Sequence, residues 1–183
     1  MINDYEARRD NTDQDFAVAN TTDNASNDDV ISTLNSLIET CKDGQEGFQQ
    51  AAEGVERSDL KSVFYEFSQQ RSQFAGELQG LVRELGGDPE TSSSVAGAIH
   101  RGWINIKSAV TGRDDAAILN ECERGEDVAK NAYKEALQAN LPANVSEVIQ
   151  RQSSAVQSAH DQIKALRDSA DNTETSSTAG TSY

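Results

Sequence analysis

The fold is decided by residues 60–89, LKSVFYEFSQQRSQFAGELQGLVRELGGDP. Apolar side chains recur there at steps of three and four residues, which matches one face of a helix, whereas a strand would show steps of two. The series breaks at Gln70 and Arg71 and resumes at Phe74. Gly86 and Gly87 then end the helix, and the following Asp-Pro pair prevents its resumption. This stretch therefore predicts an amphipathic helix whose apolar face is interrupted by polar residues near its middle.

Three further stretches, residues 30–55, 118–137 and 145–166, carry the same spacing of apolar side chains. Each also has one polar break roughly midway along its length. The breaks lie at Gln45, at Gly125 and Glu126, and at Gln152. Short links between the first and second helices and between the third and fourth make each pair antiparallel. The sequence thus predicts an all-α antiparallel four-helix bundle whose polar breaks meet in one layer.

The connection between the second and third helices is long and has a helical pattern of its own. Its apolar side chains are Val95, Ile99, Trp103, Ile106 and Val110, and Gly112 closes it. A helix of about 18 residues spans roughly 27 Å, enough to carry the chain back along the bundle. The third helix would then run parallel to the second, which is typical of ferritin-like bundles with one long crossover. An up-down-up-down bundle with an extra packed helix is the alternative.

The bundle is predicted to span residues 28–170. Residues 1–27 are rich in Asn, Asp and Thr, and residues 171–183 are also polar. Such segments bury too little apolar surface to offset the entropy of ordering them, so both are expected to be disordered tails.

Composition limits the classes of function. The chain has 183 residues, 36% of them hydrophobic, with 16 basic and 31 acidic side chains and a formal net charge of −15. That balance disfavours binding to nucleic acid or to anionic lipid. No stretch of some 18 apolar residues predicts a membrane span, and the N-terminal sequence lacks the pattern of a secretory signal. A cytoplasmic location is the expectation.

Cys41 and Cys122 fall on apolar stripes and are expected to be buried free thiols, with a disulfide or metal pair as the alternative.

Ferritin-like two-metal centres use a Glu from each of two helices and a Glu-x-x-His from each of the other two. The corresponding spacings here are Gln70-x-x-Gln73 and Gln157-x-x-His160. Neither glutamate of the paired motif is present, and one of the two histidines is missing. The weak metal candidates that remain, for iron or manganese, are Glu46, Glu123, Glu126 and His160.

Arg71 bears on the same question, because an inward guanidinium repels a metal cation. We expect it to pair with Glu46 or Glu126 in a hydrogen-bonded core layer.

Phosphate-binding glycine loops are absent from the sequence, and with His100 and His160 as the two histidines no nucleophile has an obvious base. We therefore predict no catalytic residue and no cofactor.

Several segments resemble a bacterial family of ferritin-like four-helix-bundle proteins of unknown function. They are LIETCKDGQEGF, ELGGDP, HRGWINIKSAVTGRDDAAILNECERGEDVAKNAYKEAL and LPANVSEVIQRQSSAVQSAHDQIKALRD. The resemblance covers about residues 29–169 and neither tail. It implies the ferritin-like fold and a bacterial, cytoplasmic protein linked to stress, but it supplies no activity.

The sequence therefore favours a non-enzymatic bundle of unknown biochemical role. It would act through association, as a dimer or with another protein, and would be stress-related. The alternative is an iron- or manganese-binding ferritin-like protein with a degenerate site.

Overall fold

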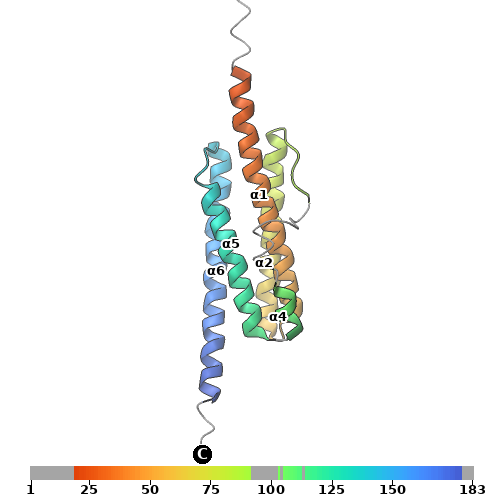
Figure 1. Ribbon diagram of the computed structural model, residues 1–183, viewed down its shortest axis with the longest axis vertical. Coiled ribbons are helices and arrows are strands. Elements are labelled where there is room, and N and C mark those ends of the chain that lie inside the picture. The colour runs from red at the N-terminus through yellow and green to blue at the C-terminus, as the bar shows by residue number, and fades with distance from the viewer. Residues whose placement is uncertain (1–18, 92–102, 104, 113, 179–183) are drawn as a thin grey trace, which may run out of the picture.

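The computed structural model describes residues 19–91, 103, 105–112 and 114–178. Within this part of the chain there are helices and no strand: α1 (Ala19–Gly54), α2 (Ser58–Glu84), α4 (Ile106–Gly112), α5 (Asp115–Ala136) and α6 (Ala143–Thr178). Figure 1 shows the four long helices side by side along the molecule, with the short α4 near one end. The predicted all-α class is confirmed.

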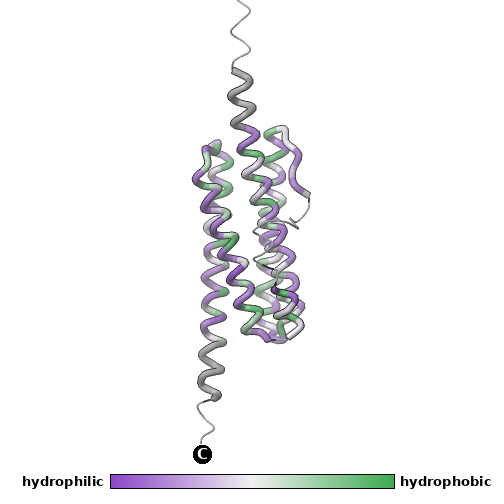
Figure 2. The backbone as a smooth tube through the Cα atoms, viewed as in Figure 1, coloured by the Kyte–Doolittle hydropathy of each residue, from purple (hydrophilic) through white to green (hydrophobic). Residues whose placement is uncertain are grey.

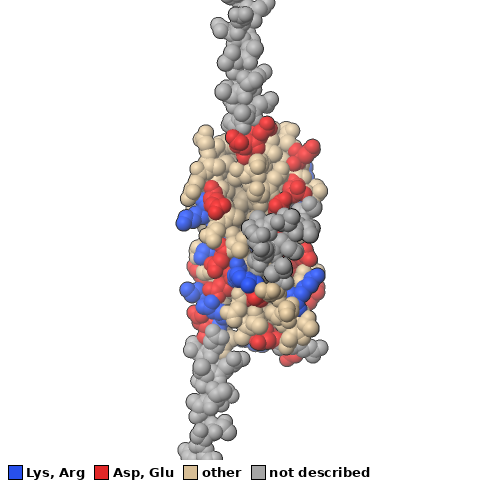
Figure 3. All heavy atoms as spheres, in the orientation of Figure 1, with Lys and Arg blue, Asp and Glu red and all other residues tan. Residues whose placement is uncertain are grey.

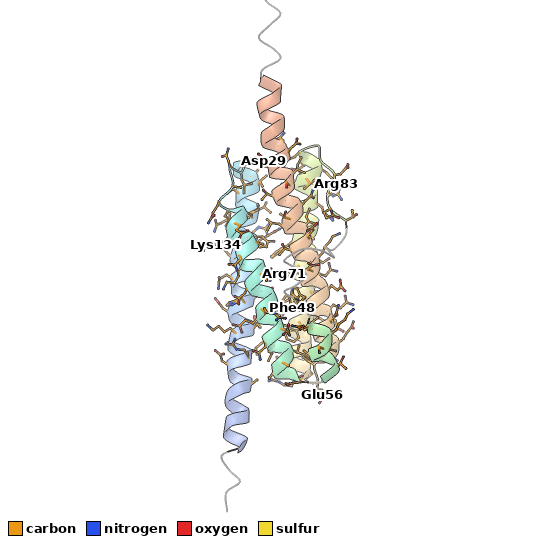
Figure 4. The ribbon with its side chains drawn as sticks, viewed as in Figure 1. Asp29, Phe48, Glu56, Arg71, Arg83 and Lys134 are labelled. Atoms are coloured by element: carbon orange, nitrogen blue, oxygen red, sulfur yellow. The ribbon has the colours of Figure 1, made fainter. Side chains whose placement is uncertain are left out.

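The long helices form two antiparallel pairs, α1 with α2 and α5 with α6 (Figure 1). In Figure 4, Asp29, Arg83 and Lys134 lie at one end of the bundle and Glu56 lies at the other. The backbone N–H of Glu56 donates to Asp115 Oδ1 at 3.1 Å, so α5 begins beside the turn that joins α1 to α2. Consequently α5 runs parallel to α2, as the long connection predicts. Of the crossover residues named above, Val95 and Ile99 lie outside the described residues.

The ends of the helices follow from local sequence. Gly86 has φ of 81°, a value that favours glycine, and its N–H donates to Arg83 O at 3.0 Å while that of Gly87 donates to Val82 O at 2.9 Å. This is a Schellman arrangement, and it closes α2 where the sequence predicts. At the start of α5, the Asp114 side chain accepts hydrogen bonds from the next turn, at 3.0 and 3.2 Å. That cap satisfies backbone donors that the helix leaves unpaired.

Two helices extend beyond the predicted limits of residues 28 and 170. α1 begins at Ala19 and α6 continues to Thr178. A helix that is already nucleated gains one hydrogen bond for each residue it adds, so it can continue into polar sequence. Of the predicted tails, residues 1–27 and 171–183, the parts 1–18 and 179–183 lie outside the described residues.

The core divides into two apolar clusters along the bundle axis. The upper cluster, at the Asp29 end, includes Leu34, Leu37, Phe74, Tyr133 and Ile149, and its members are all buried. The lower cluster includes Phe48, Phe64, Phe67, Trp103 and Ile118. Figure 2 shows the corresponding alternation of hydrophobic and hydrophilic residues along every long helix.

Trp103 joins the crossover to the lower cluster. It is 7% exposed, and its ring meets that of Phe48 edge-on at 4.9 Å between centroids. A Cβ added at Gly47 would lie 2.1 Å from the indole, and one added at Gly125 would lie 2.3 Å from it. The glycines of α1 and α5 therefore make the space that the indole fills.

Candidate functional site

A polar layer separates the two apolar clusters. Among the described residues, the buried polar and charged side chains are Thr40, Asp43, Ser68, Arg71, Glu126, Gln152 and His160. Most of them come from the mid-helix breaks in the apolar pattern or from the turns next to those breaks. Figure 4 shows Arg71 near the middle of the bundle, just above Phe48. Of the predicted breaks, those at Arg71 and Glu126 meet at the boundary between the clusters, whereas Gln152 lies within the upper cluster and bonds to other partners.

An ion pair between Arg71 and Glu126 forms the centre of this layer. The guanidinium Nη2 donates to Glu126 Oε2 at 2.6 Å, and the two side chains are 1% and 0% exposed. The other terminal nitrogen, Nη1, donates to Gln70 Oε1 at 2.8 Å. Of the two partners expected for Arg71, the structure selects Glu126 and not Glu46.

The neighbours of Arg71 explain how a guanidinium is accommodated there. Its Cζ lies 5.9 Å from the ring centroid of Phe48 and 5.6 Å from that of Phe74, so it contacts an aromatic ring from each cluster. A Cβ added at Gly44 would come within 3.3 Å of Arg71 Cγ, so the glycine on α1 leaves room for the arginine stem. Cation–π contacts add to the attraction that holds a buried guanidinium.

The two members of the pair respond differently to burial. Desolvation raises the pKa of the Glu126 carboxyl, and the nearby guanidinium opposes that rise. Burial works against the charged form of Arg71 as well, but the Glu126 carboxylate outweighs it and raises the pKa of Arg71. Arg71 Nε and Glu126 Oε1 have no hydrogen-bond partner within the described part of the chain. The pair is thus joined by a single N–H···O contact and not by the stronger two-pronged arrangement.

A second network crosses all four long helices above the ion pair. Tyr133 Oη on α5 lies 3.1 Å from Cys41 Sγ on α1 and donates to Gln152 Oε1 on α6 at 2.8 Å. Gln152 Nε2 donates to Glu77 Oε2 on α2 at 2.7 Å. Because the single Tyr133 hydroxyl proton points to Gln152, the Cys41 thiol is the donor toward Tyr133. The chain of contacts ends at the surface, where Arg151 donates to Glu77 Oε2 at 2.9 Å.

The thiols in these clusters are poor nucleophiles. Burial raises the pKa of Cys41 to about 11 and raises that of Cys122 well above its usual value. Only the thiolate reacts readily or binds metal, so neither sulfur is suited to chemistry at neutral pH. Both cysteines are free and buried, which confirms that prediction.

Of the four predicted metal candidates, only Glu123 and His160 come together. Glu46 is exposed and accepts a hydrogen bond from Gln50 at 3.0 Å, while Glu126 is held by Arg71. Glu123 and His160 are neighbours, with Glu123 Oε1 4.0 Å from His160 Nε2. Across residues 19–91, 103, 105–112 and 114–178, no group of three or more His, Cys, Asp and Glu side chains is arranged to hold a metal ion.

His160 also lies beside two carboxylates that residue spacing does not point to. Its Nε2 is 3.1 Å from Asp127 Oδ1, and its Nδ1 is 3.0 Å from Asp161 Oδ1. The hydrogen bond with His160 lowers the pKa of Asp161. Glu123 also forms an ion pair with Arg167 of α6, so a cation already neutralises that carboxylate.

Comparison with known protein families gives one result. A family model described as "Domain of unknown function (DUF2383)" matches residues 29–139. The chain belongs to the DUF2383 family. Comparison with curated proteins gives no match.

No described helix is both long enough and apolar enough to cross a membrane.

The DUF2383 match covers some of the buried polar residues and not others. It spans α2, α4, α5 and most of α1, so it contains Arg71, Glu126 and Trp103. The helix that supplies Gln152 and His160, α6, follows the matched residues but packs into the same core. The ion pair and its crossover wedge therefore belong to the DUF2383 part of the molecule.

Sequence reasoning missed Tyr133 and Glu77 as members of the network. Tyr133 falls within residues 118–137, the apolar stretch of the third predicted helix, and it lies in the upper cluster. Its hydroxyl was the available signal, since a buried tyrosine O–H usually finds a partner. Glu77 gave no comparable signal, because a glutamate on a helix surface is ordinarily solvated.

Proposed function

We propose that this chain is a ferritin-like four-helix bundle from a bacterium, located in the cytoplasm, that has no enzymatic activity and acts by association. It would bind a second copy or another protein, and its role would be stress-related. The parallel arrangement of α2 and α5, with a connection that returns along the bundle, supports the ferritin-like assignment. The bacterial and stress-related parts rest on the sequence resemblance alone.

The Arg71–Glu126 pair is the observation that carries the proposal. A two-metal centre needs several carboxylates to balance its charge. At the centre of this bundle, a buried guanidinium 2.6 Å from Glu126 already balances that carboxylate. Arg71 cannot be deprotonated near neutral pH, so it would repel a divalent cation placed beside it. The central residues therefore do not fit the metal group that the ferritin-like resemblance implies, and no chemical step is derived through it.

The test is a joint measurement of metal content and association. We expect protein purified without chelator to contain far less than one iron or manganese per chain by elemental analysis. Light scattering over a range of concentrations should show a dimer, or pull-down with tagged protein should recover a stoichiometric partner. A strict monomer that recovers no partner would contradict the proposal.

A second candidate, a weak divalent-metal site, is favoured by one observation. The imidazole of His160 lies within 3.1 Å of Asp127 and 4.0 Å of Glu123, on adjacent helices. A histidine and carboxylates are ligand types that manganese or iron accepts, but within the described residues these three are not arranged around one ion, and Arg167 competes for Glu123. Stoichiometric metal that is lost in His160→Ala would support this site. An unchanged Tm on addition of Mn²⁺ or Fe²⁺ would exclude it, because a ligand that binds the folded state raises its stability.

A further inference from the structure

A groove runs between α1 and α5 in the upper half of the bundle, and we call it the α1–α5 groove. Its volume is about 530 Å³. Its walls are the side of α5 between Val128 and Ala139 and, on α1, Thr33, Ser36, Leu37 and Thr40. A smaller hollow of about 250 Å³ shares Thr33 and Ala139 with it and continues past Asp29. From Asp29 to Thr40, α1 rises roughly 16 Å, or about three turns, so a short helix can lie along the groove.

The floor of the groove is apolar. Leu37 and Ala136 are buried there, while Val128 and Ala132 are half-buried. The alanines of α5 leave room for side chains of a partner to enter between the two helices. Covering this strip removes apolar surface from water, which is the main favourable contribution to most protein association.

The hydroxyl groups on the α1 wall are already paired. Those of Thr33, Ser36 and Thr40 each donate to the backbone carbonyl four residues earlier, at 2.9, 3.1 and 2.9 Å. A partner in extended conformation brings backbone N–H and C=O groups that this wall does not pair, whereas a helix pairs its own. The wall therefore suits the apolar side of a helix.

The charged side chains along the two walls are acidic. Within residues 28–40 of α1 they are Asp28, Asp29 and Glu39, and the charged member of the α5 wall is Glu135. Asp28, Asp29 and Glu135 are exposed. In Figure 3 the surface over this part of the molecule is largely uncharged, with acidic side chains above and beside it and a basic group at its outer edge.

The basic side chains of α5 lie away from the groove. Lys130 is 3.8 Å from Asp127, a residue on the α6 side of the helix. Lys134 is on the outer side of α5, away from α1, in Figure 4. Arg124 precedes the groove by one turn and forms an ion pair with Glu121. The edges of the groove therefore favour a cationic partner.

We propose that the α1–α5 groove binds a basic amphipathic helix of another protein. This rests on the proposed function, because it names the class of partner and the surface of that association. The apolar side of the helix would cover the floor, and its lysines or arginines would lie beside Asp29 and Glu135. The net charge of −15 attracts such a partner at long range and repels a second copy of this chain.

The probe is a fluorescent synthetic peptide of about 14 residues, with leucines at steps of three and four on one side and lysines on the other. A peptide of the same residues in shuffled order keeps the charge but has no apolar side. Fluorescence anisotropy with the full chain should show that the helical probe binds at least about tenfold more tightly than the shuffled one. Added salt should weaken its binding, because salt screens the attraction between lysines and carboxylates.

Two variants place the probe in the groove. Glu135→Lys reverses the charge at the edge, and Ala132→Leu fills the space between the helices. Each should weaken binding of the helical probe at least about fivefold, while circular dichroism remains that of the wild type. The matched control, Glu66→Lys, makes the same change of charge at an exposed position on α2 and should leave binding unchanged.

Equal binding of the two peptides, or binding that Glu135→Lys and Ala132→Leu leave intact, would overturn this inference. The proposed function would still stand if light scattering or pull-down shows association, and it would fall as well if the chain neither dimerises nor recovers a partner. A protein that ignores the probe but forms a dimer that these two variants dissociate would assign the groove to a second copy, and that result also overturns the inference.

Discussion

The lower apolar cluster holds four aromatic residues, Phe48, Phe64, Phe67 and Trp103, whereas the upper cluster holds Phe74 and Tyr133 among mainly aliphatic side chains. The lower half is also reached by the crossover, since Trp103 and Ile106 are buried there. Aromatic rings occupy more volume than aliphatic side chains, and the helices of the lower half carry glycines that face the indole. The difference shows that the crossover is part of the core in one half of the bundle, and not simply a connection.

The largest expected effect concerns the lower half. Replacing Trp103 with Ala should lower the free energy of unfolding by about 4 kcal/mol, because a buried ring is lost and the glycines around it cannot fill the cavity. Chemical denaturation measures the loss. Hydrogen exchange should show that the α5 amides near Ile118 lose more protection than those near Tyr133. Equal losses in both halves would mean that the two clusters behave as one unit. Trp103→Phe keeps an aromatic ring in place and should lose less stability.

The boundary between the halves gives the next largest effect. Arg71→Met should destabilise the fold by about 3 kcal/mol, because Glu126 then remains buried without a counter-charge. Replacing Glu126 with Leu in the same protein should recover much of that loss, because the buried charge is removed. Thermal or urea unfolding of the two variants measures how much of the lost free energy of unfolding the second substitution recovers. If Arg71→Met alone leaves stability unchanged, then the pair does not contribute to the fold as its burial indicates.

Much of this architecture could be predicted from residue spacing. Steps of three and four residues predicted the long helices, and the interruptions at Arg71 and Glu126 predicted the layer in which these two side chains meet. Gly86 marked the end of α2 because it can adopt a positive φ. The length of the link to the third helix predicted that α5 runs parallel to α2.

Other features could not be predicted, because they depend on the relative rotation of the helices. Spacing placed Glu46 and Glu126 equally close to the layer, but the rotation of α1 turns Glu46 toward solvent. The approach of Asp127 to His160 depends in the same way on how α5 faces α6. Similarly, residue spacing gives no reason for glycine at positions 47 and 125, because the reason is the indole of Trp103, which lies against both.

The smallest expected effect lies where the network of the upper half reaches the surface, at Glu77. Partial burial acts to raise the pKa of this carboxyl, but the hydrogen bonds from Arg151 and Gln152 prevail and lower it. A carboxyl whose pKa is lower in the folded state stabilises the fold above its unfolded pKa, and that contribution is lost as the pH falls through the folded pKa. Because Glu77 is 42% exposed, solvent screening keeps the effect below about 1 kcal/mol.

The stability of the wild type should therefore fall more steeply on the acid side of pH 4.5 than that of Glu77→Gln, which has no carboxyl to protonate. Arg151→Gln removes one of the two donors and should reduce the steepness in the same direction. Urea unfolding at a series of pH values separates the three proteins. If the wild type and Glu77→Gln give parallel curves, the contact between α2 and α6 at Glu77 contributes nothing to folding, and any contribution of the network comes from its buried members, Tyr133 and Gln152.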